Sequence, residues 1–200
     1  MEILETIKFY NRTGKLPENV LREAMYQHGL FESFLTEGSM ADTPERRDVL
    51  SKINNDNYIR NNYKQFADEV RRNKRSQYLT PYTAQDYIKG NIQTYQVPGY
   101  EIGFALKPIG KSEKGNVLLD IISVHNNTNI GGIGEALIDS AIRLGGTHLD
   151  HYDGFLSDFY SKKGFEEYDR YPWDDQYMPS NWDKEKDGTP DVVMRRLPNI

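Results

Sequence analysis

The spacing of apolar side chains changes near residue 80 and divides the chain into two parts. Before that point, apolar residues recur at helical spacing between turn signals such as Gly14, Pro17 and Gly29. After it, short runs rich in β-branched and aromatic residues alternate with helical ones. The pattern predicts helices at residues 2–12, 18–28, 44–53, 57–74, 134–144 and 155–163, and strands at residues 100–106, 117–124, 147–152, 165–171 and 192–197.

This order of elements predicts a mixed α/β domain at residues 79–200, preceded by a helical region at residues 1–78. Two strands joined through a helix by short connections imply that strands 117–124 and 147–152 are parallel. A long aromatic loop joins the last two strands, which favours an antiparallel pair.

The sequence assigns no activity to the helical region, although this region is a candidate surface for a protein partner. A basic run near its end could contact phosphate or an acidic partner. The simpler interpretation is a solvated helix terminus, where cations complement the negative end of the helix dipole. This run consists of Arg71, Arg72, Lys74 and Arg75.

Composition and charge narrow the classes of function. The chain has no Cys, so no disulfide, thiolate metal site or cysteine nucleophile is available. It begins without a secretion signal and has no long apolar run, which predicts a soluble, cytoplasmic protein with no membrane partner. Residues 1–80 carry 13 Lys and Arg against 12 Asp and Glu, whereas residues 81–200 carry 12 against 18. This acidic domain argues against nucleic acid as a partner and favours a cationic acceptor such as an amine.

A glycine-rich turn between a strand and a helix is the most informative segment. The buried strand 117–124 leads to Asn129-Ile130-Gly131-Gly132-Ile133-Gly134, and an amphipathic helix follows. Such a turn exposes backbone N–H groups at the positive end of a helix, which binds a pyrophosphate without a cationic side chain. Glycine lets the phosphate approach the backbone.

Other interpretations of this turn are a tight connection without a ligand, a Walker-type loop and a dinucleotide-binding turn. No Gly-Lys-Ser/Thr sequence follows, which argues against a Walker loop. Leu137 stands where a dinucleotide-binding turn has its third glycine, and the segment comes late in the chain. A tight connection and a phosphate-binding turn remain.

A second motif, Phe159-Tyr160-Ser161-Lys162-Lys163-Gly164-Phe165, follows the next predicted strand and helix. Together the two motifs resemble those of the GNAT (Gcn5-related) N-acyltransferases, which carry Arg/Gln-x-x-Gly-x-Gly/Ala at the first position and Phe-Tyr-x-Lys-x-Gly-Phe at the second. The resemblance covers residues 82–197. The phrases around Asp150 and Trp173 further resemble GNAT-type proteins encoded by bacteriophages.

The resemblance implies a splayed central sheet, with the pantetheine arm of acetyl-CoA or another acyl-CoA between strands 117–124 and 147–152. Two departures reduce the expected affinity: Asn129 replaces the usual Arg or Gln, and Asp153 stands where many members have Asn. Backbone groups of Ile122, Ser123 and Val124 would hydrogen-bond the arm. The pyrophosphate would lie on Ile130, Gly131, Gly132, Ile133, Gly134 and Glu135, and Asn129 and Tyr160 are further expected cofactor-binding residues.

Acyl transfer to an amine requires a proton donor for the leaving thiolate and a base for the amine. The resemblance gives the first role to Tyr160, beside the sulfur of the cofactor; a Tyr packed at the domain edge is the alternative. Asp120 is the candidate base, because it is a lone carboxylate in an apolar strand and burial raises the pKa of such a group. His125, His151 and ordered water are alternative bases.

Two further groups of residues were candidates for chemistry. Asp150, His151, Asp153 and Asp158 lack the spacing of a metal site, since Asp150 and His151 face opposite sides of a strand and Asp153 is expected to cap the next helix. No metal is predicted. The aromatic segment 171–182 is either a wall of the acceptor site that holds an ammonium group or a rigid loop packed on the sheet.

Three functions are therefore open. The first is an N-acyltransferase that transfers an acetyl or related acyl group from acyl-CoA to an amine. The second is a GNAT-fold component of a larger assembly, such as a phage particle or host-interaction factor, located in the host cytoplasm or the virion and docked through residues 1–78. The third is a nucleotide-binding enzyme of another fold. Tyr160 and the three glycines favour the first, whereas Asn129 favours the second.

Overall fold

Seven strands form one sheet in the order β1-β2-β3-β4-β5-β7-β6. A computed structural model describes residues 41–198. Neighbouring strands are antiparallel except for β4 and β5, which are parallel. The mixed sheet, its parallel pair and the antiparallel last pair are confirmed. The strands span Ile59–Arg60 (β1), Gln93–Gln96 (β2), Ile102–Lys111 (β3), Val117–Asn126 (β4), Gly146–Tyr152 (β5), Glu166–Tyr171 (β6) and Val192–Arg196 (β7).

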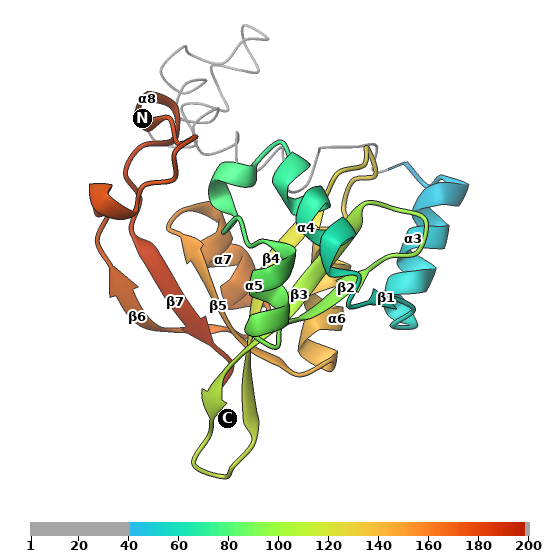
Figure 1. Ribbon diagram of the computed structural model, residues 1–200, viewed down its shortest axis with the longest axis horizontal. Coiled ribbons are helices and arrows are strands. Elements are labelled where there is room, and N and C mark those ends of the chain that lie inside the picture. The colour runs from blue at the N-terminus through green and yellow to red at the C-terminus, as the bar shows by residue number, and fades with distance from the viewer. Residues whose placement is uncertain (1–40, 199–200) are drawn as a thin grey trace, which may run out of the picture.

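Helices cover both faces of this sheet. Figure 1 shows α4 and α5 on the near face, with α6 behind the sheet and α3 at one side. The helices predicted at residues 44–53, 134–144 and 155–163 are confirmed, with small shifts at their ends. The helices span Pro44–Asn54 (α3), Tyr63–Arg72 (α4), Ala84–Lys89 (α5), Gly134–Arg143 (α6), Phe155–Lys162 (α7) and Lys184–Asp187 (α8), with 3-10 turns at Ser76–Tyr78 and Asp175–Tyr177.

The helix predicted at residues 57–74 is wrong in its first part. Ile59 and Arg60 pair with β2, and Asn61 then turns the chain with a φ of 58°, so that α4 begins only at Tyr63. The sequence pattern also missed α5 and β2. Both are too short for a clear periodicity, and α5 is instead stabilised by a capping box between Thr83 and Asp86.

Two apolar clusters, one on each face of the sheet, form the core. The larger one joins Val49 and Ile53 of α3 with α6, α7 and the strands. The smaller one joins Phe66 of α4 with Tyr87 of α5 and Ala105 of β3. The predicted helices 2–12 and 18–28 lie outside the described residues, and the division at residue 78 stays a prediction. No helix within residues 41–198 has the length and apolarity needed to cross a membrane.

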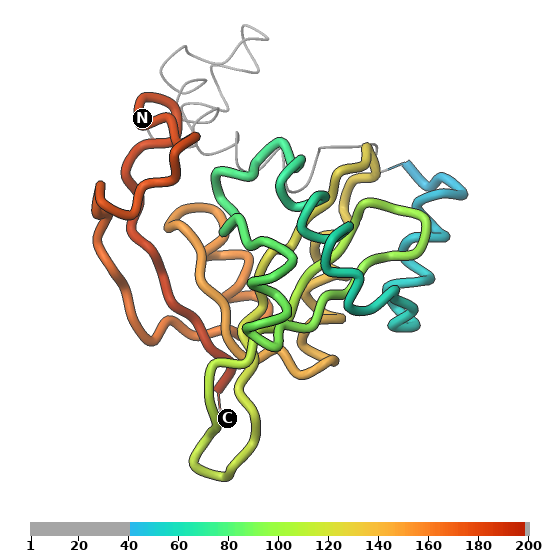
Figure 2. The backbone as a smooth tube through the Cα atoms, in the orientation of Figure 1, coloured from blue at the N-terminus to red at the C-terminus, as the bar shows by residue number. Residues whose placement is uncertain are grey.

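The parallel strands β4 and β5 pair over a short stretch and then separate. Their registered pairs are Leu119 with Gly146 and Asp120 with His148. In Figure 2 the two strands run together near the base of the β3–β4 hairpin and diverge away from it. The splayed sheet expected from the sequence is confirmed, and the divergence creates the space for a ligand.

Gly146 is placed where the two strands meet, and Gly146→Ala should destabilise the fold. A Cβ at this position would lie 2.5 Å from Cγ1 of Ile121 and 2.9 Å from the carbonyl oxygen of Ala141. Overpacking of this kind reduces the free energy of unfolding by about 1–3 kcal/mol. Urea denaturation measures the loss, with the exposed change Gln85→Ala as control. Equal midpoints for Gly146→Ala and wild type would contradict the packing described.

Candidate active site

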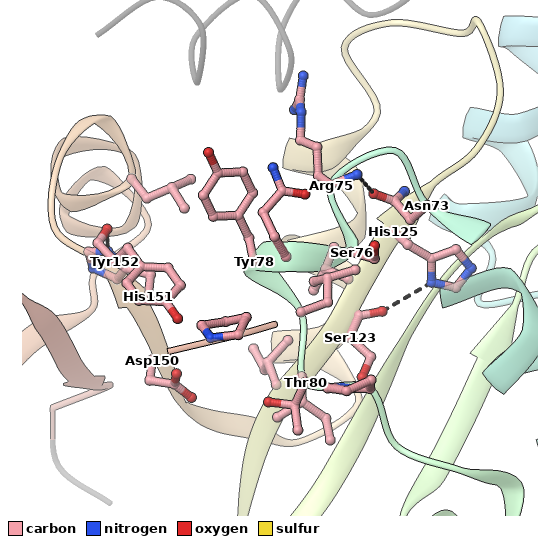
Figure 3. Close-up of a pocket in the computed structure, with 18 of the residues that line it drawn as sticks. Asn73, Arg75, Ser76, Tyr78, Thr80, Ser123, His125, Asp150, His151 and Tyr152 are labelled. Atoms are coloured by element: carbon pink, nitrogen blue, oxygen red, sulfur yellow. Dashed lines mark hydrogen bonds between the residues drawn. The ribbon is translucent and has the colours of Figure 1, made fainter. Parts of the chain in front are cut away.

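A cavity of about 680 Å³ opens where β4 and β5 diverge. Its walls come from residues 121–126 of β4, residues 150–152 of β5, the start of α6, the connection 71–81 and the loop residues 177–181. Figure 3 shows β4 and β5 side chains facing each other across this space, with the connection that carries Tyr78 and Thr80 between them.

The predicted site residues divide into those that line the cavity and those beside it. Those that line it are Ile122, Ser123, Val124, Gly134 and Tyr160. The turn before Gly134 and the carboxylate of Asp120 are outside the lining set. That second group consists of Asp120, Asn129, Ile130, Gly131, Gly132, Ile133 and Glu135. Their roles in binding stay predictions.

The glycine turn leads directly into an uncapped helix. Gly132 has a φ of 70°, a conformation that favours glycine, and α6 begins at Gly134 with no side-chain cap. The first N–H groups of a helix have no partner within it, so they are available to an anion. The turn is shaped by Asn126, whose Nδ2 donates to the carbonyl of Ile130 at 2.8 Å.

Two charged side chains lie beside this turn. Glu135 forms an ion pair with Lys163 at 2.7 Å, which draws its carboxylate toward α7. Arg46 of α3 donates from Nε to the carbonyl oxygen of Gly131 at 3.2 Å. Arg46 could not be predicted from the sequence as a partner of the turn, because it lies 85 positions before it.

A β-bulge interrupts β4 at the cavity. Ile122 pairs with Ala105 and His125 with Gly103, so Ser123 and Val124 together face one residue of β3. Ser123 has a φ of 54°, which is rare for a residue other than glycine. Its Oγ lies 3.0 Å from the hydroxyl of Tyr87, and its carbonyl oxygen lies 3.0 Å from Nδ1 of His125. Bulges occur next to active sites, where they redirect backbone and side-chain groups.

Tyr160 contributes a hydroxyl with no hydrogen-bond partner among residues 41–198. The residue is 6% exposed, and its ring packs against His151 with centroids 5.2 Å apart. Burial raises the pKa of Tyr160, and the negative charge of Asp150 raises it further. The hydroxyl therefore keeps its proton at neutral pH.

Two carboxylates, one on β4 and one on β5, lie on the same face of the sheet. Asp120 pairs in register with His148, and Asp150 lies two positions further along β5, on the same face. Burial raises the pKa of Asp120 to about 7, with a further contribution from the charge of Asp150 and an opposing one from Lys107. Burial also raises the pKa of Asp150, which lines the cavity. Asp150 was not predicted as a base, because in the sequence its neighbours His151 and Asp153 suggest only a metal site.

The two histidines considered as bases have no ring nitrogen free for a substrate. His151 Nδ1 lies 2.8 Å from the carbonyl oxygen of Tyr152, and its Nε2 accepts from Nε of Arg195 at 2.9 Å. His125 Nδ1 contacts the carbonyl of Ser123, and its Nε2 lies 3.3 Å from a carboxylate oxygen of Glu69. Both ring nitrogens of each histidine are thus engaged within the protein, and the role of either as a base stays a prediction.

The predicted cap at Asp153 is also wrong. Gly154 is the N-cap of α7, with a φ of 142°, and it forms no side-chain cap. The carboxylate of Asp153 instead accepts from Ser157 Oγ at 2.7 Å and pairs with Arg170. Across residues 41–198, no three His, Asp or Glu side chains come together as metal ligands.

The aromatic segment 171–182 contacts the sheet through Trp173 and Trp182, whose rings pack against Tyr152 of β5. The rings of Trp182 and Tyr152 have centroids 4.7 Å apart, and Trp182 is 5.2 Å from Tyr78. The hydroxyl of Tyr78 donates to Asp187 at 2.6 Å. Residues 177–181 reach the cavity, so the packed loop also forms a wall.

Comparisons with known proteins give distant likenesses. No family model matches the chain, and a search of curated proteins finds no match. Among solved structures, the chain is similar to a protein provisionally named phosphinothricin N-acetyltransferase, with 13% identity, a TM-score of 0.48, and coverage of 68% of this chain and 91% of that one.

Two further solved structures are similar. N-acetylglutamate synthase from Neisseria gonorrhoeae, complexed with coenzyme A and L-arginine, has 16% identity and a TM-score of 0.37; the match covers 66% of this chain and 31% of that one. Ribosomal-protein-alanine N-acetyltransferase from Brucella melitensis has 15% identity and a TM-score of 0.39, with 74% and 95% covered. Such distant likenesses assign no function to this chain.

The raised pKa of Asp120 predicts that Asp120→Asn flattens the pH dependence of stability. The unfolded chain releases this proton near the ordinary value of 3.8, whereas the folded chain holds it to about 7. The free energy of unfolding of the wild type should therefore fall as the pH rises between about 4 and about 7, because the unfolded state binds fewer protons in this window. Urea denaturation at several pH values tests this. An exposed change on α7, Asp158→Asn, is the control. A decline that persists unchanged in Asp120→Asn would exclude this carboxylate as its source.

Proposed function

We propose that the chain is an N-acyltransferase that takes an acyl group from an acyl-CoA such as acetyl-CoA and transfers it to an amine. The observation that carries this proposal is the divergence of β4 and β5 beside a helix N-terminus without a side-chain cap, with Tyr160, whose hydroxyl has no partner within residues 41–198, lining the same space. The two motifs that resemble those of GNAT enzymes include this turn and this tyrosine.

The chain fits an acyl-CoA at two separate points. The turn at Gly132 and the first N–H groups of α6 suit the pyrophosphate, and they need no side chain. Beyond Asp120 and His148, β4 and β5 no longer pair with each other. The backbone N–H and C=O groups on their facing edges suit the amide groups of a pantetheine arm. We assign the turn residues and the backbone of Ile122, Ser123 and Val124 to these roles.

The acyl thioester supplies an activated carbonyl carbon for attack by the amine. The carbon–nitrogen bond forms and the carbon–sulfur bond breaks, so the amine must lose a proton and the thiolate must gain one. Tyr160 donates the second proton, since it remains protonated at neutral pH. The pair Asp120 and Asp150 accepts the first, because the pKa of Asp120 is raised to about 7. Asp150 faces the cavity, and Asp120 lies on the adjoining strand.

Gly132→Glu tests the cofactor assignment. Wild-type protein should be stabilised by acetyl-CoA, by about 2.7 kcal/mol at a hundred times the dissociation constant. Gly132→Glu should lose this stabilisation, because its carboxylate would stand at the anion position of the helix N-terminus. Thermal melting with and without acetyl-CoA measures both.

The matched control is Gly115→Glu. Gly115 also has a positive φ, of 83°, and no atom lies near its added Cβ, so it carries the same backbone strain away from the turn. Gly115→Glu should respond to acetyl-CoA as the wild type does. If neither CoA nor acetyl-CoA shifts the melting temperature of the wild type, the cofactor assignment is wrong.

Tyr160→Phe tests the proton donor. The variant should lower kcat by about 10²- to 10⁴-fold while acetyl-CoA affinity stays within a few-fold, because the ring and its packing remain and only the proton is lost. Amines from a screen of polyamines, aminoglycosides and lysine peptides serve as acceptors, with release of the CoA thiol as the readout. Tyr100→Phe is the control, because the hydroxyl of Tyr100 donates to Asp48 of α3 and the residue is outside the cavity lining. If Tyr160→Phe keeps the kcat of the wild type, Tyr160 is not the proton donor and the thiolate is protonated by solvent.

A further inference from the structure

We propose that Lys107, held in place by the hydroxyl of Tyr82, is a positioning residue for the two carboxylates Asp120 and Asp150. Its ammonium group keeps one carboxylate of the pair ionised, so that the pair can accept a proton from the acceptor amine. An N–H bond of the protonated amine breaks, an O–H bond forms on the carboxylate, and the neutral amine attacks the thioester. The inference rests on the proposed acyltransferase function and adds to it a residue that neither motif contains.

The three charged side chains lie in a row across the sheet. Lys107 is directly opposite Asp120 in the antiparallel pair of β3 and β4. Residues opposite each other in such a pair point to the same face, with Cβ atoms about 4.5–5.5 Å apart. Asp150 is on this face too, because Asp120 pairs with His148 and Asp150 follows two positions later. One cation and two carboxylates therefore occupy neighbouring positions on β3, β4 and β5.

An aromatic neighbour holds the ammonium group of Lys107. Its Nζ donates to the hydroxyl of Tyr82 at 3.1 Å and lies 5.6 Å from the centroid of the same ring. The ring of Tyr82 packs against the buried ring of Tyr87, with centroids 5.4 Å apart. Within residues 41–198 the hydrogen bond of this ammonium goes to Tyr82 and not to a carboxylate. The positive charge is thus anchored beside the carboxylates without a direct hydrogen bond to them.

The segment that carries Tyr82 also lines the cavity. The backbone N–H of Tyr82 donates to the carbonyl oxygen of Thr80 at 2.9 Å, and Thr80 is part of the lining. In Figure 3, Thr80 and Asp150 lie at the same end of the cavity. A substrate amine that reaches Asp150 from the cavity therefore meets a carboxylate whose protonation depends on Lys107.

The position of Lys107 balances two opposing effects on the pair. Burial raises the pKa of both carboxyl groups, and Lys107 supplies the positive charge that opposes the rise in each. The hydrogen bond to Tyr82 and the two carboxylates raise the pKa of Lys107, so the ammonium keeps its charge. An ammonium in direct contact with a carboxylate would hold it ionised far below neutral pH. The arrangement observed leaves the pair able to gain and lose a proton near neutral pH.

The other titratable groups around the pair do not supply this charge. His148, beside Asp120, is neutral near pH 7, because burial and the charge of Arg196 lower its pKa. The guanidinium of Arg196 lies over the ring of Tyr168, 5.3 Å from its centroid. Among residues 41–198, Lys107 is thus the cation that acts on both carboxylates. Burial raises the pKa of the nearby tyrosines, which therefore stay neutral: Tyr152, Tyr160 and Tyr168.

The test follows the carboxyl groups directly and needs no ligand. Protein labelled with ¹³C at the aspartate carboxyl carbons is titrated by NMR, and Asp120→Asn and Asp150→Asn assign the two resonances. Lys107→Met removes the charge and keeps a long side chain, and it should raise the protonation midpoint of the pair by about 1 pH unit. Lys107→Arg should keep the wild-type midpoint. Lys111→Met, an exposed change on the same strand, is the matched control and should also keep it.

Tyr82→Phe should move the midpoint in the opposite direction. Without the hydroxyl, the ammonium of Lys107 is free to approach Asp120, which should lower the midpoint of the pair. General damage to this face of the sheet would not produce opposite signs in the two variants. A midpoint in Tyr82→Phe at or above that of the wild type would overturn the role of Tyr82. An unchanged midpoint in Lys107→Met would overturn the proposal as a whole.

The wild type alone provides a further measurement, which does not depend on the folding of any variant. One carboxyl group of the pair should titrate near pH 7. A pair that is fully ionised well below neutral pH would overturn the proposal, because it could not accept a proton from the amine.

Kinetics connect the carboxyl pair to the reaction. With acetyl-CoA and an amine from the screen, Lys107→Met should move the acidic limb of the kcat/KM profile to higher pH by the same amount. Below the wild-type midpoint kcat/KM should fall about tenfold, and it should recover at higher pH. A loss that is equal at every pH would overturn the proposal and leave the acyltransferase function intact. Failure of the wild type to bind acetyl-CoA would instead remove the proposed function, and with it the amine as the source of the proton.

Discussion

The separation of β4 from β5 is the constraint on which the site depends. The two strands pair only at Leu119 with Gly146 and at Asp120 with His148. Beyond these pairs, the backbone groups on the facing edges are not hydrogen-bonded between the two strands. Backbone N–H and C=O groups away from water need partners, so an open edge inside a domain calls for a ligand or water. Gly134 at the start of α6 and Tyr160 line the same space.

Packing on both faces of the sheet keeps this space open. On one face, α6 and α7 share an apolar cluster with the strands and hold Tyr160 against β5. On the other, the connection 71–81 contacts α8 through the hydrogen bond of Tyr78 to Asp187 and contacts the loop 171–182 through the edge-to-face packing of Tyr78 on Trp182. The strands cannot close on each other without disrupting one of these contacts. The cavity is therefore a property of the fold, and its polar groups are positioned before a ligand arrives.

The sequence predicted those parts of the site that consist of consecutive residues. The glycine turn and the segment around Tyr160 each occupy one short motif, and the longer strands and helices have clear periodicity. The bulge at Ser123 has no such signal, because its conformation is determined by contacts with Tyr87 and with His125. Glu69 reaches His125 across 56 positions of sequence. Pairings of this kind depend on the tertiary structure, as does the approach of Asp150 to Asp120.

The charges around the cavity favour a particular class of acceptor under the proposed function. The segment 71–81 places Arg71, which also pairs with Asp68, and Arg75 on the lining; from the sequence, a solvated helix end was the simpler interpretation and a contact with phosphate or an acidic partner the alternative. The other wall carries Asp150, with Asp120 on the adjoining strand. Under this proposal the cationic side chains and the helix N-terminus bind the anionic cofactor. An anionic acceptor would then be repelled by the two carboxylates. A cationic amine would be attracted by the same carboxylates and would leave its proton with them, so one pair of residues can both select the acceptor and activate it.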